Sequence, residues 1–269
     1  METNWKEWIK YLDFKSTTSR RNKVIKWLIE RNVEFTLHHY KTGTNVIVKL
    51  GEGPKYFAIS SHLDRVRESG GANDNASAMA VCLHVIDEYL TRKDDRSLMI
   101  FFFDEEETGL KGSRAYVNEI GTEQINSLIN MELVGNGEYG ILWPVKKHSS
   151  LIVQQLLQTS HEDQFFKAPF LLMPDFPLYY SDADAFLESG FKNAITITCL
   201  SKNDFELAKR YIEIKENGAD DNELYSMISR AEIMQYYHSK LDNSGMINNL
   251  TIYSTANLIL DSVILIKNL

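Results

Sequence analysis

A histidine or a carboxylate follows each of three short apolar segments of the sequence, at His62, at Asp104 to Glu107 and at Glu132. Ligands of open α/β sheets bind beyond the carboxyl ends of the strands, so we expect these groups to meet at one edge of a sheet. Four neighbouring acids repel one another unless a cation offsets their charge. The pattern therefore predicts a metal site.

Each candidate residue also has an ordinary structural interpretation when it is taken alone. His62 could be a structural histidine, and Asp74 could cap the helix that follows it. The acids at 104–107 could form the first turn of a helix, where negative charge is favourable. Glu132 could belong to a loop, and His238 could be a core group beside aromatic residues. The metal interpretation depends on the combination of these residues.

The elements that must position these groups alternate between strand and helix patterns. Such alternation predicts an α/β fold with a mostly parallel (mixed) central sheet and helices on both faces. The absence of repeats and of a Pro/Gly-rich linker favours a single domain over residues 1–269. We expect strands at 33–40, 45–50, 55–61, 97–103, 125–133 and 194–200, and helices from 5, from 19, and at 76–90, 110–119 and 249–266.

Charge and composition narrow the possible partners and the location. The net charge of −8 and the pI near 5.4 argue against a nucleic-acid partner, which needs a basic surface. No segment has the length and apolar character of a membrane span, and the charged first residues do not resemble a signal peptide. Cys82 and Cys199 lie in apolar segments and are expected to be free thiols. We therefore expect a cytoplasmic protein, and the oligomeric state stays open.

Six short stretches between about residues 55 and 245 stand in an order that is informative as a set. They are Ser61-His62-Leu63-Asp64, Gly71-Ala72-Asn73-Asp74-Asn75-Ala76-Ser77, Glu106-Glu107-Thr108-Gly109-Leu110-Lys111-Gly112-Ser113, Asn130-Met131-Glu132-Leu133-Val134-Gly135, Ser181-Asp182 and Tyr237-His238. Together they resemble the co-catalytic zinc aminopeptidases, which are metallopeptidase family twenty-eight of clan MH and are related to the bacterial leucyl aminopeptidases. The resemblance implies a zinc-exopeptidase (phosphorylase/hydrolase-like) fold and a zinc metallopeptidase that removes N-terminal residues from small peptides.

The resemblance also implies five metal ligands and two zinc ions. Asp74 would bridge the two ions. One ion would also bind His62 and Glu132, and the other would bind Glu107 and His238. Imidazoles and carboxylates suit zinc and leave positions for water and substrate, and two divalent cations balance three carboxylates and one hydroxide. Co²⁺ or Mn²⁺ could occupy such a site in place of zinc.

Three further residues receive catalytic roles from the same resemblance. Glu106 would be the general base, which takes a proton from the attacking water and delivers it to the departing amine. Asp64 would hold His62 through the ring nitrogen that does not bind metal. Tyr237 would polarise the scissile carbonyl, although a core tyrosine is an equally simple interpretation.

The sequence departs from the family pattern at several points. Glu132 stands where the aminopeptidases usually have Asp, and its longer side chain could alter the metal site. Glu105 lengthens the acidic run and allows an assignment shifted by one residue, although the stretch 108–110 favours Glu106 and Glu107. The charged segment 201–231 predicts a helical insertion, which could be a lid, a wall of the specificity pocket or a peripheral element.

Three alternative functions remain open on the sequence. A glutaminyl-peptide cyclase on the same scaffold would use one zinc ion. A carboxypeptidase or aminoacylase would need a basic group for the substrate carboxylate, and only Arg65 and Arg67 lie close to the first ligand in sequence. A catalytically silent peptide-binding protein would typically have lost a ligand or the base. The aromatic residues of 165–180 could line an apolar pocket, the core or an interface.

Overall fold

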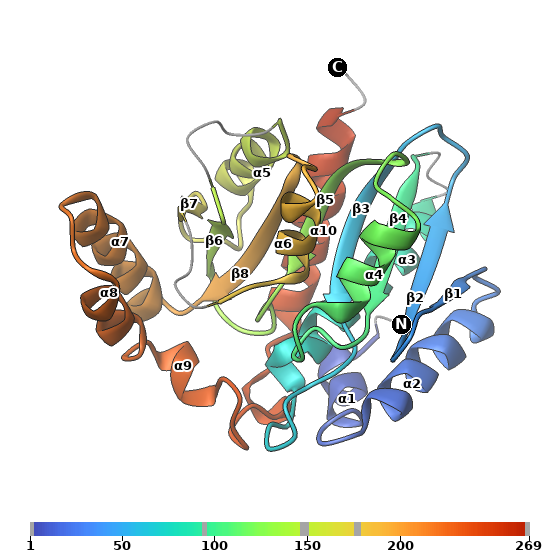
Figure 1. The fold of residues 1–269 in the computed structure, drawn as a ribbon, viewed down its shortest axis with the longest axis horizontal. Coiled ribbons are helices and arrows are strands. Elements are labelled where there is room, and N and C mark those ends of the chain that lie inside the picture. Colours follow the sequence, from blue (N-terminus) through green and yellow to red (C-terminus); the bar gives the residue numbers. More distant parts are fainter. Residues whose placement is uncertain (1–2, 93–95, 146–150, 175–178, 267–269) are drawn as a thin grey trace.

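A central β-sheet organises the protein (Figure 1). Its strands are β1 (Thr36–His39), β2 (Thr44–Leu50), β3 (Tyr56–His62), β4 (Leu98–Phe103), β5 (Ile125–Met131), β6 (Tyr139–Trp143), β7 (Leu171–Leu172) and β8 (Ala194–Leu200). The computed structural model describes residues 3–92, 96–145, 151–174 and 179–266, and within them the strand order is β1-β2-β4-β3-β5-β8-β6-β7. The four central strands, β4, β3, β5 and β8, run parallel, and antiparallel pairs flank them.

Helices cover both faces of this sheet (Figure 1). The helices are α1 (Trp5–Lys10), α2 (Thr17–Glu30), α3 (Ser77–Arg92), α4 (Lys111–Glu119), α5 (Leu151–Glu162), α6 (Asp182–Glu188), α7 (Lys202–Glu216), α8 (Asp221–Ile228), α9 (Glu232–Tyr236) and α10 (Asn249–Ile266). On one face α3 packs against α10, α1 and β3, and α10 also contacts α5. On the other face α4 packs against α6, which lies on β3, β5 and β8.

The strand β4 shows why the centre of the sheet is apolar on both faces. Successive side chains of a strand point to opposite faces. Ile100 and Phe102 therefore join the cluster under α3 and α10, and Phe101 and Phe103 join the cluster under α4 and α6. All four side chains are fully buried. Burial of a Phe or Ile side chain contributes roughly 1.5–3 kcal/mol, so this strand anchors both layers.

The predicted α/β class with a mixed sheet is confirmed. The expected strand at 194–200 and the expected helix at 249–266 coincide with β8 and α10. The sequence interpretation extended the strand at 125–133 too far, because β5 ends at Met131 and Leu133 adopts a positive φ of 58°. It missed β6, β7, α5 and α6, whose sequences are short or mixed in polarity.

The segment 201–231 is helical, as expected, and contains α7 and α8. Its apolar side chains form a third cluster with the edge of the sheet, in which Phe205 and Tyr211 pack with Ile141 and Leu200. Tyr211 is fully buried. These contacts place α7 on the sheet, and α8 leads on to α9 (Figure 1).

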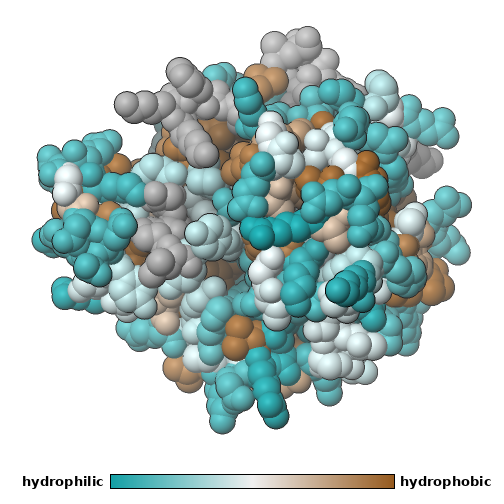
Figure 2. All heavy atoms as spheres, viewed as in Figure 1, coloured by the Kyte–Doolittle hydropathy of each residue, from teal (hydrophilic) through white to brown (hydrophobic). Residues whose placement is uncertain are grey.

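The face of the molecule drawn in Figure 2 has no large apolar patch among its described residues. Hydrophilic residues cover most of the face in Figure 2, and hydrophobic residues form small separate patches. In the described part of the chain, no helix combines the length with the apolar character that a membrane span requires. Cys82 and Cys199 are buried free thiols, as expected.

Candidate active site

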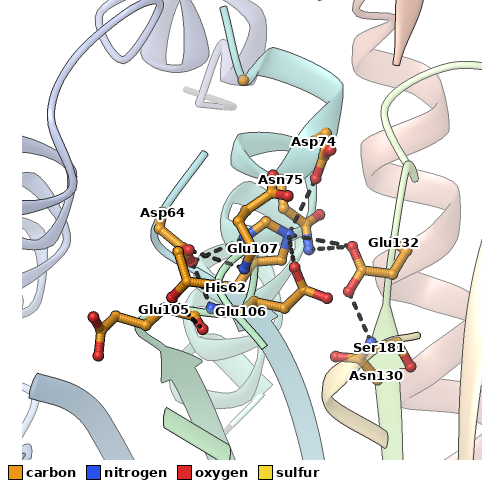
Figure 3. A network of polar contacts seen from close by, with 12 residues as sticks. His62, Asp64, Asp74, Asn75, Glu105, Glu106, Glu107, Asn130, Glu132 and Ser181 are labelled. Atoms are coloured by element: carbon orange, nitrogen blue, oxygen red, sulfur yellow. Dashed lines mark hydrogen bonds and ion pairs between the residues drawn. The ribbon is translucent and has the colours of Figure 1, made fainter. Parts of the chain in front are cut away.

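Three of the predicted metal ligands, His62, Glu107 and Glu132, lie at or just beyond the carboxyl ends of parallel strands (Figure 3). His62 is the last residue of β3 and pairs in register with Phe103 at the end of β4. Glu106 and Glu107 follow β4, and Glu132 follows β5. Parallel neighbouring strands end at the same edge, so strand order alone brings these side chains together.

The two other predicted ligands reach this edge from irregular backbone. Asp74 lies in the π-helical turn η1 (Ala72–Ala76) that precedes α3, with a non-helical φ of −110° and ψ of 85°. His238 follows α9 and adopts a positive φ of 55°, which is uncommon for a residue with a side chain. Irregular backbone of this kind clusters at functional sites.

The carboxylate of Asp74 lies between two imidazoles. Its Oδ1 is 3.1 Å from Nε2 of His62, and its Oδ2 is 3.4 Å from Nε2 of His238. Nε2 of His62 is also 3.4 Å from Glu132 Oε2, and Nε2 of His238 is 3.0 Å from Glu107 Oε2. Two groups of residues that could each hold a metal ion therefore share Asp74, and they contain the same residues as the two ligand sets that the resemblance implies.

Glu106 lies beside this cluster without belonging to either group. Its Oε2 is 4.0 Å from Nε2 of His62. A third set, His62 with Glu106 and Glu107, also has ligand atoms within 4.8 Å of one another. Distance alone therefore allows Glu106 either as a ligand or as a neighbour of the ligands.

The electrostatics of the cluster favour a bound cation. Burial, together with neighbouring carboxylates, raises the pKa of Glu106 well above its usual value and raises that of Glu132. Burial alone would lower the pKa of His238, but contacts with Asp74 and Glu107 raise it to about 9. Acids removed from water in this way are costly unless positive charge accompanies them.

The donor atoms themselves fit zinc. Glu107 Oε1 is buried and has no hydrogen-bond partner among the residues that the structure describes, and the buried Nε2 of His238 lies near the carboxylates of Glu107 and Asp74 without a well-formed hydrogen bond. Such orphaned atoms are unfavourable in a protein interior unless they coordinate an ion. Two imidazoles and three carboxylates are suitable zinc ligands. The residues present therefore fit the metal that the sequence implies.

Asp64 organises the loop after β4 as well as the histidine. Its Oδ1 lies 3.3 Å from Nδ1 of His62. Its two oxygens also accept backbone N–H bonds, Oδ1 from Glu106 at 3.1 Å and Oδ2 from Glu107 at 3.0 Å. Arg20, which is fully buried, donates to the carbonyl oxygens of Asp64 and Gly71. Sequence reasoning expected the contact with His62 but missed the backbone bonds and Arg20.

Two asparagines hold the carboxylate of Glu132. Nδ2 of Asn75 donates to its Oε2 at 2.9 Å, and Nδ2 of Asn130 donates to its Oε1 at 3.0 Å (Figure 3). Ser60 in turn donates to Asn130 Oδ1 at 2.6 Å. The longer side chain of Glu132 is therefore fixed at both oxygens. Both asparagines belong to the motif stretches, and that position was their only signal in the sequence.

Two more buried acids, Asp242 and Asp182, lie near the cluster. The sequence interpretation gave neither of them a role. Asp242 accepts backbone N–H bonds from Asn73 at 2.6 Å and Asp74 at 3.1 Å, and burial raises its pKa to about 6. Asp182 is fully buried at the start of α6, and burial raises its pKa to about 8. Acids this far from their usual pKa are a common feature of functional sites.

An apolar pocket opens beside the acidic cluster. The empty space in this pocket, open solvent at its mouth included, is about 510 Å³. Its polar end is formed by Asp74, Glu106 and Glu132, and Tyr237 also lines it. Burial raises the pKa of the Tyr237 hydroxyl, so this group stays protonated and can donate a hydrogen bond. The remaining lining residues are Leu133, Trp143, Tyr179, Tyr180, Thr198, Leu200, Ile233 and Met234.

Comparisons with solved structures show which class has this fold. The chain matches a leucine aminopeptidase precursor from Bacteroides thetaiotaomicron with a TM-score of 0.72 and 14% identity, over 96% of this chain and 95% of that one. It matches a glutaminyl cyclase from the same organism with a TM-score of 0.73 and 14% identity, over 96% of both chains. At such identity the likeness shows the fold alone, which is the predicted zinc-exopeptidase fold.

The sequence comparison identifies the family. The model of "Peptidase family M28" matches residues 45–263, and the chain therefore belongs to this family. The predictions of the family and of a zinc metallopeptidase are thus confirmed at the level of the family. A vacuolar membrane protease from Schizosaccharomyces japonicus is 30% identical over 110 residues, which are 40% of this chain and 13% of that protein. This chain spans only a small part of the curated relatives it matches.

The expected cytoplasmic location is wrong on this comparison, because the matched fungal relatives are named for a vacuolar membrane. The expectation rested partly on two free thiols. Burial raises the pKa of both Cys82 and Cys199, and buried thiols of this kind are unreactive in any compartment. Free cysteines therefore carried less information about location than the sequence argument assumed.

Proposed function

We propose that this chain is an aminopeptidase that removes N-terminal residues from peptides and uses two zinc ions. The observation that carries the proposal is the position of Asp74 between His62 and His238, each of which has a second carboxylate beside it. A carboxylate with one oxygen toward each imidazole suits a ligand that bridges two ions. A single-ion enzyme has no need for this second group.

In the proposed site His62, Asp74 and Glu132 would hold one zinc ion, and Asp74, Glu107 and His238 would hold the other. When bound, the ions supply Lewis acidity and lower the pKa of water. Co²⁺ and Mn²⁺ are possible substitutes, because the donors are imidazole and carboxylate.

Glu106 serves as the general base. Its carboxylate lines the cavity, and its backbone N–H is fixed by Asp64. The raised pKa suits a group that must take a proton from water and later give it to the departing amine near neutral pH. Tyr237 lines the same cavity with a protonated hydroxyl, which can donate a hydrogen bond to the carbonyl oxygen under attack.

The apolar pocket receives the side chain of the N-terminal residue of the substrate. Its walls include Leu133, Trp143 and Leu200, and its acidic end holds Glu106 and Glu132. This juxtaposition suits a large apolar side chain whose peptide carbonyl lies next to the metal ligands. Small peptides that begin with Leu, Met or Phe are the expected substrates.

The test combines zinc analysis with a panel of aminoacyl chromogenic substrates on the wild-type chain and on Glu106→Gln. We expect about two zinc ions per chain, hydrolysis that chelation abolishes, and a kcat lower by roughly 100-fold or more in the variant, with its zinc content retained. Zinc bound with no turnover, and no effect of Glu106→Gln on peptide affinity, would indicate a silent binding protein.

A glutaminyl cyclase is the second candidate, because a cyclase has the same fold at a TM-score of 0.73. It predicts one zinc ion per chain and release of ammonia from peptides that begin with glutamine. The same zinc analysis and an ammonia assay distinguish the two enzymes. One zinc ion, ammonia release and no hydrolysis of aminoacyl substrates would replace the aminopeptidase proposal with the cyclase.

A further inference from the structure

The short helix α9 receives its N-terminal cap from another helix. Ala231 occupies the N-cap position of α9 and has no side-chain group that can accept a hydrogen bond. Asp204, in the first turn of α7, supplies the missing acceptors. Its Oδ1 accepts from the backbone N–H of Glu232 at 2.7 Å, and its Oδ2 accepts from that of Ile233 at 2.9 Å.

Asp204 itself is buried, and the helix that carries it is anchored to the sheet. The side chain is 5% exposed, and Ser201 caps the helix that carries it. The neighbouring Phe205 is buried in the cluster that joins α7 to β6 and β8. The buried carboxylate of Asp204 is held on a fixed helix and accepts two backbone N–H bonds. Such a group strongly constrains the segment that donates those bonds.

The constrained segment carries several parts of the candidate site. Ile233 and Met234 of α9 line the apolar pocket. Tyr237 and His238 follow directly, and their rings stack with centroids 3.7 Å apart. His238 has a positive φ of 55°, and its Nε2 lies 3.0 Å from Oε2 of Glu107. A shift of α9 would therefore move the pocket wall and the last ligand together.

We propose that Asp204 is a positioning residue that holds α9, and through it both His238 and the apolar wall, in place. The inference rests on the proposed function, since it takes His238 to be a zinc ligand. On this proposal the helical segment 201–231 holds the site in a fixed position and is not a lid that opens and closes. Asp204 acts through α9 and does not touch the reacting atoms.

The test uses Asp204→Asn and a matched control. Because the two bonds of Asp204 go to different oxygens, an asparagine can satisfy only one of them. Asp204→Ala removes both, and Asp204→Asn remains informative if the alanine variant fails to fold. The control is Asp220→Ala, which removes the cap of the neighbouring α8, where Asp220 accepts from the backbone N–H of Glu223 at 2.9 Å.

Three measurements separate positioning from general stability. Zinc affinity, measured by competition with a chromophoric chelator, should fall roughly 10-fold or more at one of two sites in Asp204→Asn and stay unchanged in Asp220→Ala. Amide hydrogen exchange of the metal-free protein should accelerate at 232–238 only in the Asp204 variants. The preference in kcat/KM for Leu over Ala substrates should fall by roughly threefold or more in Asp204→Asn alone.

Two results would overturn the inference. One is wild-type zinc affinity and wild-type exchange at 232–238 in Asp204→Asn. The other is an equal loss of zinc affinity in the Asp204 and Asp220 variants, which would reflect lower stability only. A wild-type chain that binds no zinc would refute the proposed function instead, and exchange at 232–238 would still decide whether Asp204 holds α9.

Discussion

The substitution Asp64→Asn tests how the site is held together. The carboxylate of Asp64 is 6% exposed and accepts the backbone N–H of Glu106 on one oxygen and that of Glu107 on the other. An asparagine offers one acceptor oxygen, so one buried N–H would face an amide NH₂ group in its place. The loop that carries the proposed base Glu106 and the proposed ligand Glu107 would then lose one of the two bonds that hold it.

The magnitude follows from these two bonds. A hydrogen bond to a charged group contributes about 1.5–3 kcal/mol, and an unsatisfied buried donor costs about 1–3 kcal/mol. We expect Asp64→Asn to lower the free energy of unfolding by about 2–4 kcal/mol, which corresponds to roughly 4–16 °C in Tm for a chain of this size. Loss of orientation at His62 and Glu107 should also weaken zinc binding by roughly 10–100-fold.

The matched control is Asp163→Asn. Asp163 also accepts two backbone N–H bonds, from Phe165 at 2.7 Å and Phe166 at 3.0 Å, but a single oxygen, Oδ1, takes both. An asparagine can keep both bonds there, so its Tm should stay within about 2 °C of the wild type. Calorimetry and chelator competition on the three proteins provide the measurement. Equal Tm and zinc affinity for Asp64→Asn and Asp163→Asn would refute the reasoning.

Three further outcomes are expected. If free zinc is kept at 100 times the Kd of a site, chelation should lower Tm by roughly 5–11 °C for each such site, and added zinc should restore it. An unchanged Tm would argue against a metal site that stabilises the fold. Met234→Ala should reduce the preference for large apolar N-terminal residues in kcat/KM, because Met234 lines the pocket; unchanged selectivity would place the substrate side chain elsewhere. Arg20→Met should cost about 2–4 kcal/mol in chemical denaturation, since it removes the charged donor from the buried carbonyls of Asp64 and Gly71, of which Gly71 keeps the N–H of Ala76. In the same denaturation assay Arg114→Met, which removes an exposed pair with Glu188, should change stability by less than about 1 kcal/mol.

That several of the proposed ligands lie together was predictable from the sequence, because strand topology places them at one edge of the sheet. His62 and Glu132 end or follow parallel neighbouring strands, and any fold with those strands side by side places them at one edge. His238 was predictable only through the resemblance to a family, since it is more than 100 residues from Glu132 and follows irregular backbone. The strand pattern therefore pointed to His62 and Glu132, and the family resemblance pointed to His238.

The supporting contacts could not be predicted, for a physical reason. Asp204 and Asp64 bond to backbone N–H groups of segments distant in sequence, and a backbone donor has no side-chain signature. Arg20 likewise bonds to backbone carbonyls, and a buried arginine reads in the sequence as an ordinary surface charge of a helix. Such bonds appear only when the chain is folded.

The geometry also decides against two of the ordinary interpretations of single residues. Asp74 is not a helix cap, because its carboxylate lies against His62 and His238 while Asp242 binds its backbone. The acids at 104–107 are not the first turn of the next helix, because α4 begins at Lys111 with no acid in its first turn. With those two interpretations removed, neither a helix cap nor a helix first turn accounts for the neighbouring charges of Asp74, Glu106 and Glu107, which repel one another. The proposed zinc ions would offset this repulsion and would account for the two imidazoles among the carboxylates.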